Sequence, residues 1–239
     1  MGLPMTIEMA KKARELSATG KNVISLSLGE PDFDTPDFIK ESASQAMVEN
    51  FTHYMPVPGF TDVRESIAAK FKRDNGIEYT ADQIVISTGA KQSLLNIFLA
   101  LVNPGDEVII PAPYWVSYMD QADYCGADVK VLPTTMESGF KITAAQLESA
   151  ITPKSKVLIF SSPNNPCGAV YSKEDLAAIA AVVAKHPNLY IISDEIYELL
   201  NYGEVSHVSI ASFPEVYNQT ITVNGLSEGF AMTGWRIGY

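Results

Sequence analysis

The spacing of apolar residues along the chain follows two successive patterns. In the first third, apolar residues recur at helical spacing, which predicts helices over 6–20, 36–50 and 61–76. Thr35 and Pro36 would serve as the cap and first-turn proline of the second helix. From residue 83 onward, short runs rich in Val and Ile predict strands, with helices between several of them.

The predicted strands cover 22–28, 83–87, 107–111, 127–132, 156–161, 189–193 and 220–224. Two helices between them begin at capping-box pairs, Thr143 with Gln146 and Ser172 with Asp175. Most strands are β-branched runs without alternation, which is typical of strands buried on both faces. The sequence therefore predicts an α/β fold, in which a mostly parallel sheet is sandwiched by helices.

Composition narrows the possible partners. The 239 residues carry a net charge of −11, which argues against nucleic acid or an anionic membrane as partner. The longest apolar run, near 94–102, is too short to span a bilayer, and the N-terminus lacks the apolar stretch of a secretory signal. The two cysteines and three histidines lack metal-ligand spacing, so we expect no metal site and a reduced, cytoplasmic setting.

Candidate binding segments follow the predicted strands. They cover residues 88–92, 112–115, 162–168, 194–197 and 225–230. Ligands of open α/β sheets bind beyond the carboxyl ends of the strands, so these segments should converge on one crevice. Together they supply a helix N-terminus, aromatic rings, asparagines, an acid and, on the next stretch, an arginine. A flat, anionic, aromatic ligand would suit that set.

Each segment also has an ordinary structural interpretation. The turn at 88–91 could hold a phosphate through its N–H groups or could simply connect a strand to a helix, and it is not a Walker loop. Trp115 could be a core aromatic residue. Asp194 follows an apolar run directly, so it should be at least half buried and needs a partner. A structural salt bridge or a helix cap is the alternative for Asp194.

Seven segments, taken together and in order, resemble class I aminotransferases of the pyridoxal 5′-phosphate (PLP) fold type I group, near the bacterial aspartate aminotransferase branch. The segments are SLSLGEPDFDTP, YMPVPGFTDVRESIA, STGAKQSL, PAPYWVSY, SPNNPCGAVYS, SDEIYELL and NGLSEGFAMTGWRIGY. The resemblance covers the whole chain. It implies residues 1–40 as an N-terminal arm with part of a small domain, and 41–239 as a PLP-binding large domain.

The resemblance implies roles for individual residues. Asp194 would pair with the pyridine nitrogen, Tyr197 and Asn165 would bond the phenolic oxygen of the ring, and Trp115 would stack on the ring. The phosphate would bind residues of two segments, namely Gly89, Ala90, Lys91, Ser227 and Arg236. Gly29, Asn165 and Trp115 would form the substrate site, with Gly29 and Asn165 at the α-carboxylate. Tyr54 would reach the phosphate of a neighbouring subunit, which implies a homodimer with shared active sites.

Glu228 departs from the family pattern. In the family this position is the lysine that links covalently to PLP and moves the substrate proton, and a carboxylate cannot form that link. The neighbouring Gly229 departs as well. The family's chain also continues past this segment into the rest of the small domain, which carries the arginine for the substrate carboxylate. We therefore expect a fragment whose large domain is incomplete at its C-terminus.

Two classes of function remain open. The first is PLP-dependent amino-group transfer between an aspartate-like amino acid and a 2-oxo acid, impaired by Glu228 and the missing part. A different fold type I reaction, such as β-elimination, is its near neighbour. The second is a PLP-binding or structural protein without turnover.

Overall fold

The computed structural model describes residues 5–26 and 29–239, and the chain forms two compact units, Met1–Asp34 and Thr35–Tyr239. The first unit contains helix α1 (Met5–Ala18), followed by Gly20 with a φ of +81°, as the predicted stop requires. The strand predicted over 22–28 is not present in its described part, residues 22–26, and residues 27–28 lie outside the described residues.

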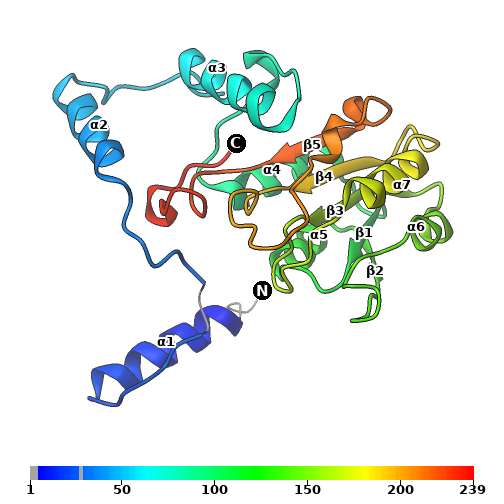
Figure 1. Cartoon of the computed structure of the whole chain (residues 1–239), viewed down its shortest axis with the longest axis horizontal. Helices are drawn as coiled ribbons and strands as arrows, with labels where there is room; N and C mark the ends of the chain where they lie inside the picture. Colours follow the sequence, from blue (N-terminus) through cyan, green and yellow to red (C-terminus); the bar gives the residue numbers. More distant parts are fainter. Residues whose placement is uncertain (1–4, 27–28) are drawn as a thin grey trace. The chain divides into compact units, whose positions relative to one another are not determined.

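The second unit is built on a five-stranded parallel sheet in the order β2–β1–β3–β4–β5 (Figure 1). The strands are β1 (Glu107–Pro111), β2 (Asp128–Leu132), β3 (Ser155–Ser161), β4 (Tyr190–Asp194) and β5 (Thr220–Val223). Every pairing between neighbours is parallel, which confirms the predicted sheet.

Helices cover both faces of this sheet, also as predicted. Val108 and Ile110 of β1 pack against α4 (Ala90–Leu101) and α5 (Ser117–Tyr124) on one face. Ile109, between them, points to the opposite face, which is covered by α6 (Ala144–Ala150) and α7 (Lys173–Val183). The apolar runs of the sequence thus supply two hydrophobic layers from the same strands.

One strand departs from the expectation of burial on both faces. β2 is partly exposed along its whole length because it lies at the sheet edge and has a strand neighbour on one side only. Both capping boxes are confirmed: Thr143 accepts a 3.2 Å bond from the Gln146 N–H, and Ser172 accepts a 3.1 Å bond from the Asp175 N–H.

The prediction that Thr35 caps the next helix is wrong. Helix α2 (Asp37–Val48) has Pro36 at its N-cap, and the Thr35 hydroxyl instead donates a 2.5 Å bond to the Ala231 carbonyl. Helix α3 (Thr61–Lys70) was predicted correctly and continues as a π-helical turn, Phe71–Asn75, that ends at Gly76 with a φ of +69°. Short 3₁₀ turns occupy Ala81–Gln83, Ile210–Ser212, Tyr217–Gln219 and Thr233–Trp235.

The strand predicted over 83–87 is also wrong. Only Ser87 forms a β-bridge, which is antiparallel to Gly238, and Gly238 in turn bridges Gly225. The N–H of Ile86 bonds the Pro58 carbonyl instead, so the segment has no continuous strand to pair with. This bridge nevertheless ties the last residues of the chain to the turn before α4.

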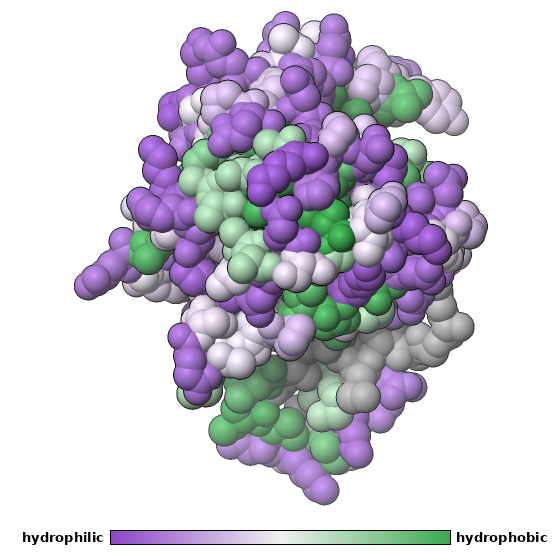
Figure 2. All heavy atoms as spheres, turned by 90° about the vertical axis from the view of Figure 1, so that its right-hand side faces the viewer, coloured by the Kyte–Doolittle hydropathy of each residue, from purple (hydrophilic) through white to green (hydrophobic). Residues whose placement is uncertain are grey.

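The surface mixes polar and apolar side chains on the face drawn in Figure 2. No helix in residues 5–26 and 29–239 has the length and apolar character needed to cross a membrane.

Candidate functional site

The sheet register brings the predicted segments to one edge. Ser161 at the end of β3 is aligned with Asp194 at the end of β4, which is aligned with Val223 at the end of β5. The order 2-1-3-4-5 changes direction between β1 and β3, which is where ligands bind in open α/β sheets. There, Asn164 Nδ2 donates a 3.3 Å bond to the Pro113 carbonyl and joins the two loops.

Asp194 is buried at this edge, as predicted, with 4% of its surface exposed. Tyr118 donates a 2.6 Å hydrogen bond to Asp194 Oδ2, and the Ile196 N–H donates a 3.3 Å bond to Oδ1. Burial raises the pKa of Asp194 to about 6, and these two hydrogen bonds oppose that rise. The partner is therefore a neutral phenol rather than the cation of a salt bridge.

Tyr118 was not singled out from the sequence. It lies in the first turn of α5, and its backbone N–H bonds the Trp115 carbonyl at 3.0 Å. A buried carboxylate needs hydrogen-bond donors, and a tyrosine in the segment after a neighbouring strand can supply one. This requirement could have indicated Tyr118 as a partner of Asp194.

Asn165 and Tyr197 were predicted to act on the same ligand atom, and the structure places them in contact. Asn165 Nδ2 donates a 3.1 Å bond to the Tyr197 hydroxyl oxygen. Burial, followed by the negative charge of Glu228, raises the pKa of Tyr197 to about 12. The Tyr197 hydroxyl therefore keeps its proton at neutral pH and can donate it in a hydrogen bond.

The turn before α4 lies against Arg236. Gly89 has a φ of +85° and a ψ of 154°, a conformation that essentially only glycine adopts, and a Cβ on it would lie 2.2 Å from Arg236 Nη2. The Gln92 and Ser93 N–H groups both bond the Gly89 carbonyl, which leaves the N–H groups of Ala90 and Lys91 as donors without an intrahelical acceptor. A guanidinium and a helix N-terminus thus meet at one point, which favours an anion.

The final segment is held against that turn by close backbone contact. A Cβ on Gly238 would lie 2.2 Å from the Ala90 nitrogen. Arg236 itself has a φ of +57°, and its Nη1 donates a 2.8 Å bond to the Thr233 carbonyl. These contacts fix the direction of the guanidinium.

A series of contacts connects Lys91, at the start of α4, through Trp115 to Tyr118, the partner of Asp194. The Lys91 ammonium lies 5.2 Å from the centroid of the Trp115 ring, so its side chain follows the indole. The Trp115 ring meets the Tyr118 ring edge-on at 5.7 Å. The sequence prediction assigned Lys91 to the phosphate, and its backbone N–H remains available for that role.

Glu228 lies in a tight turn that follows β5. Ser227 is buried, its carbonyl accepts a 3.0 Å bond from the Met232 N–H, and Ala231 has a φ of +51°. Because the charge of Glu228 raises the pKa of Tyr197, the carboxylate belongs to the same electrostatic environment as the Asn165–Tyr197 pair. Six of the predicted site residues thus converge around this sheet edge: Gly89, Trp115, Asn165, Asp194, Tyr197 and Arg236, with Glu228 beside them.

Two further predicted site residues have exposed positions. Gly29 is exposed and belongs to the N-terminal unit, so its role toward the substrate stays a prediction. The Tyr54 side chain is fully exposed to solvent. Its role at the phosphate of a neighbouring subunit also stays a prediction.

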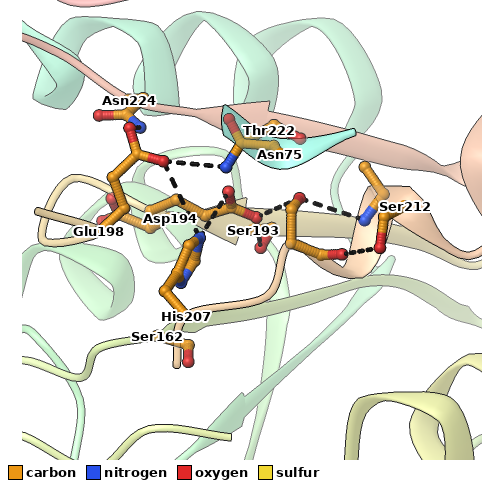
Figure 3. A network of polar contacts seen from close by, with 12 residues as sticks. Asn75, Ser162, Ser193, Asp194, Glu198, His207, Ser212, Thr222 and Asn224 are labelled. Carbon is orange, nitrogen blue, oxygen red and sulfur yellow. Dashed lines mark hydrogen bonds and ion pairs between the residues drawn. The ribbon is translucent and has the colours of Figure 1, made fainter. Parts of the chain in front are cut away.

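A buried polar network adjoins Asp194 (Figure 3). Glu195, which is fully buried, accepts bonds from Ser193 Oγ at 2.8 Å, from Ser209 Oγ at 2.6 Å and from His207 Nε2 at 3.2 Å. Glu198 pairs with Lys70 and accepts bonds from Asn75 Nδ2 at 3.0 Å and Asn224 Nδ2 at 2.8 Å. Sequence reasoning missed this network.

The network gives Glu195 and Glu198, the acidic residues on either side of Tyr197, a structural role. One carboxylate oxygen each of Glu195 and Glu198 and one ring nitrogen of His207 lie within 4.8 Å of one another, a spacing that could suit a metal ion. Both carboxylates, however, already accept several protein donors. We interpret the cluster as the support that orients the 194–198 segment.

Comparisons with known proteins identify the family of this chain. A model of the family described as "Aminotransferase class I and II" matches residues 21–239. A probable aspartate/prephenate aminotransferase of Rhizobium leguminosarum bv. phaseoli is 50% identical over 98% of this chain and 59% of its own length. The aspartate aminotransferase of Bacillus subtilis (strain 168) is 46% identical over 98% of this chain and 60% of its own length.

Solved structures give the same result. The aspartate aminotransferase of Thermus thermophilus with maleate is 44% identical and superimposes with a TM-score of 0.96, over 100% of this chain and 61% of its own. The chain thus spans about 60% of the length of the relatives it matches. The chain belongs to the class I and II aminotransferase family.

Proposed function

We propose that this chain carries the cofactor-binding part of an aspartate-type aminotransferase site. The observation that carries the proposal is the Asn165–Tyr197 pair beside buried Asp194, at the carboxyl edge of adjacent strands. The family uses PLP, and the residues present fit most of that molecule. When bound, PLP supplies an electron sink for the carbon that loses a proton.

The chain's own residues would bind and orient such a ligand. Asp194 would hold a proton on the pyridine nitrogen, and Tyr197 with Asn165 would donate to the phenolic oxygen. The Gly89 turn and Arg236 would hold the phosphate, and Trp115 would cover the ring face. Ser227 would add to the phosphate site through its hydroxyl.

Glu228 does not fit the aldehyde of the cofactor, because a carboxylate cannot replace the amine that links to it. Binding should therefore be reversible, and amino-group transfer should be impaired. The amino donor would be a dicarboxylic amino acid, in line with the names of the relatives, and the acceptor a 2-oxo acid. We further propose a cytoplasmic homodimer in which Tyr54 completes the neighbouring site.

A mass measurement tests the proposed role of Glu228. Borohydride fixes any carbon–nitrogen link between a lysine and PLP permanently. We expect no stoichiometric adduct on the native chain after PLP and borohydride, and one adduct at residue 228 in Glu228→Lys. A stoichiometric adduct at a single lysine of the native chain would contradict the proposal. An absorbance titration with PLP, which needs no covalent link, tests reversible binding separately.

A further inference from the structure

We propose that Thr134 and Asn164 are positioning residues of the cofactor site, which hold the Trp115 loop (residues 112–116) and so place the indole over the ligand ring. The inference rests on the proposed function, in which Trp115 covers the ring face. It goes beyond that function because it assigns the fit for a flat ring to two side chains that were not predicted as site residues.

Thr134 holds one side of the Trp115 loop, which connects β1 to α5. The Thr134 hydroxyl donates a hydrogen bond to the Ala112 carbonyl, and the Ala112 N–H donates a 2.9 Å bond to the Leu132 carbonyl. Thr134 follows β2, and β2 is one of the two neighbours of β1 in the sheet. The first residue of the loop is therefore bonded at both its N–H and its carbonyl to the segment at the end of β2.

Asn164 holds the next carbonyl of the loop from the opposite side. It follows β3, the other neighbour of β1, and its Nδ2 donates a 3.3 Å bond to the Pro113 carbonyl. Only one orientation of the amide fits, because the Pro113 carbonyl can only accept, while the Cys167 N–H, 3.3 Å from Oδ1, can only donate. Nδ2 also lies 3.3 Å from Ser161 Oγ, and that oxygen accepts a 3.2 Å bond from the Asn165 N–H. Asn164 thus connects the Trp115 loop to the backbone that carries Asn165.

The position of the Trp115 ring depends on these bonds. The ring is half-buried, and at the far end of the loop the Trp115 carbonyl accepts a 3.0 Å bond from the Tyr118 N–H of α5. Thr134 and Asn164 fix the near end, so the loop is held at both ends. Stacking requires an aligned ring face. A loop released at its near end should therefore lose contact with a ligand ring, while the separate phosphate contacts stay in place.

The test compares two ligands on the whole 239-residue chain by isothermal titration calorimetry. Pyridoxine 5′-phosphate carries the ring, whereas inorganic phosphate reports on the anion site alone. Thr134→Val replaces the hydroxyl with a methyl group, Thr134→Ser keeps the hydroxyl, and Asn164→Ala removes the second bond. The matched control is Thr135→Val, because Thr135 is exposed and its hydroxyl oxygen accepts a 3.3 Å bond from the Ser138 N–H within its own turn.

We expect Thr134→Val and Asn164→Ala each to bind pyridoxine 5′-phosphate about fivefold more weakly than the native chain, which is the size of effect of one hydrogen bond, and to keep the native phosphate affinity. Thr134→Ser and Thr135→Val should match the native chain for both ligands. In a Trp115→Ala background the effect of Thr134→Val should disappear, because the loop then has no indole to place. At saturation, the circular dichroism induced in the bound pyridoxine ring should be smaller in Thr134→Val than in Thr135→Val.

Native affinity for pyridoxine 5′-phosphate in Thr134→Val or in Asn164→Ala would overturn the role of that residue, and in both it would overturn the inference while leaving the cofactor site standing. An equal loss for the two ligands, or a loss in Thr134→Val that persists without the indole, would also overturn it, because the bonds would then support the fold rather than the ring. If Thr134→Val does not fold, Asn164→Ala and its combination with Trp115→Ala provide the same comparison. Failure of the native chain to bind pyridoxine 5′-phosphate would overturn both this inference and the proposed function.

Discussion

The Tyr118 hydroxyl donates a 2.6 Å hydrogen bond to Asp194 Oδ2, with 1% and 4% of the two residues exposed. In a site so well shielded from water, this one donor helps to determine how readily Asp194 ionises. It opposes the effect of burial, which is the larger influence on the pKa of Asp194.

Replacing Tyr118 with phenylalanine removes that donor and should raise the pKa of Asp194 above about 6. We expect the acidic inflection in the pH profile of pyridoxine 5′-phosphate affinity to move to higher pH, as measured by fluorescence titration. The matched control is Tyr124→Phe on the same helix, where the ring is exposed. Identical profiles for both variants would show that Tyr118 only fills space.

Asp194 also predicts a pH dependence of folding. Its pKa rises from 3.8 to about 6 on burial, so the folded chain holds this proton more tightly than the unfolded chain. The resulting stabilisation is complete below about pH 4 and is lost as the pH rises to about 6. The Asp194→Asn variant cannot ionise at this position and therefore lacks this loss. The free energy of unfolding of the variant minus that of the native chain should then increase by on the order of 3 kcal/mol as the pH rises from about 4 to about 6.

Urea unfolding at pH 4, 5, 6 and 7 measures that difference. A constant offset between the two proteins reflects the hydrogen bonds changed by the amide and does not affect the slope. If the difference stays flat with pH, the burial of Asp194 does not control its ionisation as described.

Gly89→Ala should disrupt the anion site. The new Cβ would meet Arg236 Nη2 at 2.2 Å, and the φ of +85° disfavours any side chain. We expect inorganic phosphate to bind at least about tenfold more weakly, with a loss of about 1–3 kcal/mol in stability from the backbone strain. Gly76→Ala is the matched control, because its φ is +69° and nothing lies within 4 Å of its Cβ. It should lose stability while keeping its phosphate affinity.

Arg236→Ala tests the guanidinium directly. Loss of a charged donor should reduce the binding free energy of pyridoxine 5′-phosphate by about 1.5–3 kcal/mol. Arg73→Ala provides the comparison, because that exposed arginine pairs with its neighbour Asp74. Equal affinities of the two variants for pyridoxine 5′-phosphate would show that Arg236 does not contribute to the site.

The Lys70–Glu198 pair should stabilise the segment that carries Tyr197. Both side chains are largely buried, at 17% and 7% exposure, so removing one leaves an uncompensated charge. We expect Lys70→Met alone to reduce the free energy of unfolding by about 3 kcal/mol, and the double variant with Glu198→Gln to lose less than the sum of the single variants. The exposed Lys72–Glu78 pair, treated in the same way, should show no measurable coupling.

The sequence predicted the parallel sheet because its strands are unbroken apolar runs, and it predicted the capping boxes because Thr143 and Ser172 act on neighbours three residues away. The strand at 83–87 was predicted wrongly because strand formation depends on a partner. Ser87 pairs with Gly238, and nothing local in the sequence shows that pairing.

The candidate site was likewise predicted only in part. Asp194 could be found because it follows an apolar run, and its burial is confirmed. Tyr118 was missed because its contact with Asp194 joins the first turn of α5 to the end of β4, across 76 positions of the sequence. The contacts of His207 and Ser209 with Glu195 span only 12 and 14 residues, but they depend on the path of an irregular loop, which the apolar pattern does not predict.

The bridge from Ser87 to Gly238 bears on the order of events during folding. It joins Ser87, directly before the turn at 88–91, to Gly238 near the end of the sequence. This contact therefore closes a very large loop. Contacts of such high sequence separation form late. During synthesis on the ribosome, the turn before α4 would be complete long before Arg236 emerges, and an anion could find its full set of donors only afterwards.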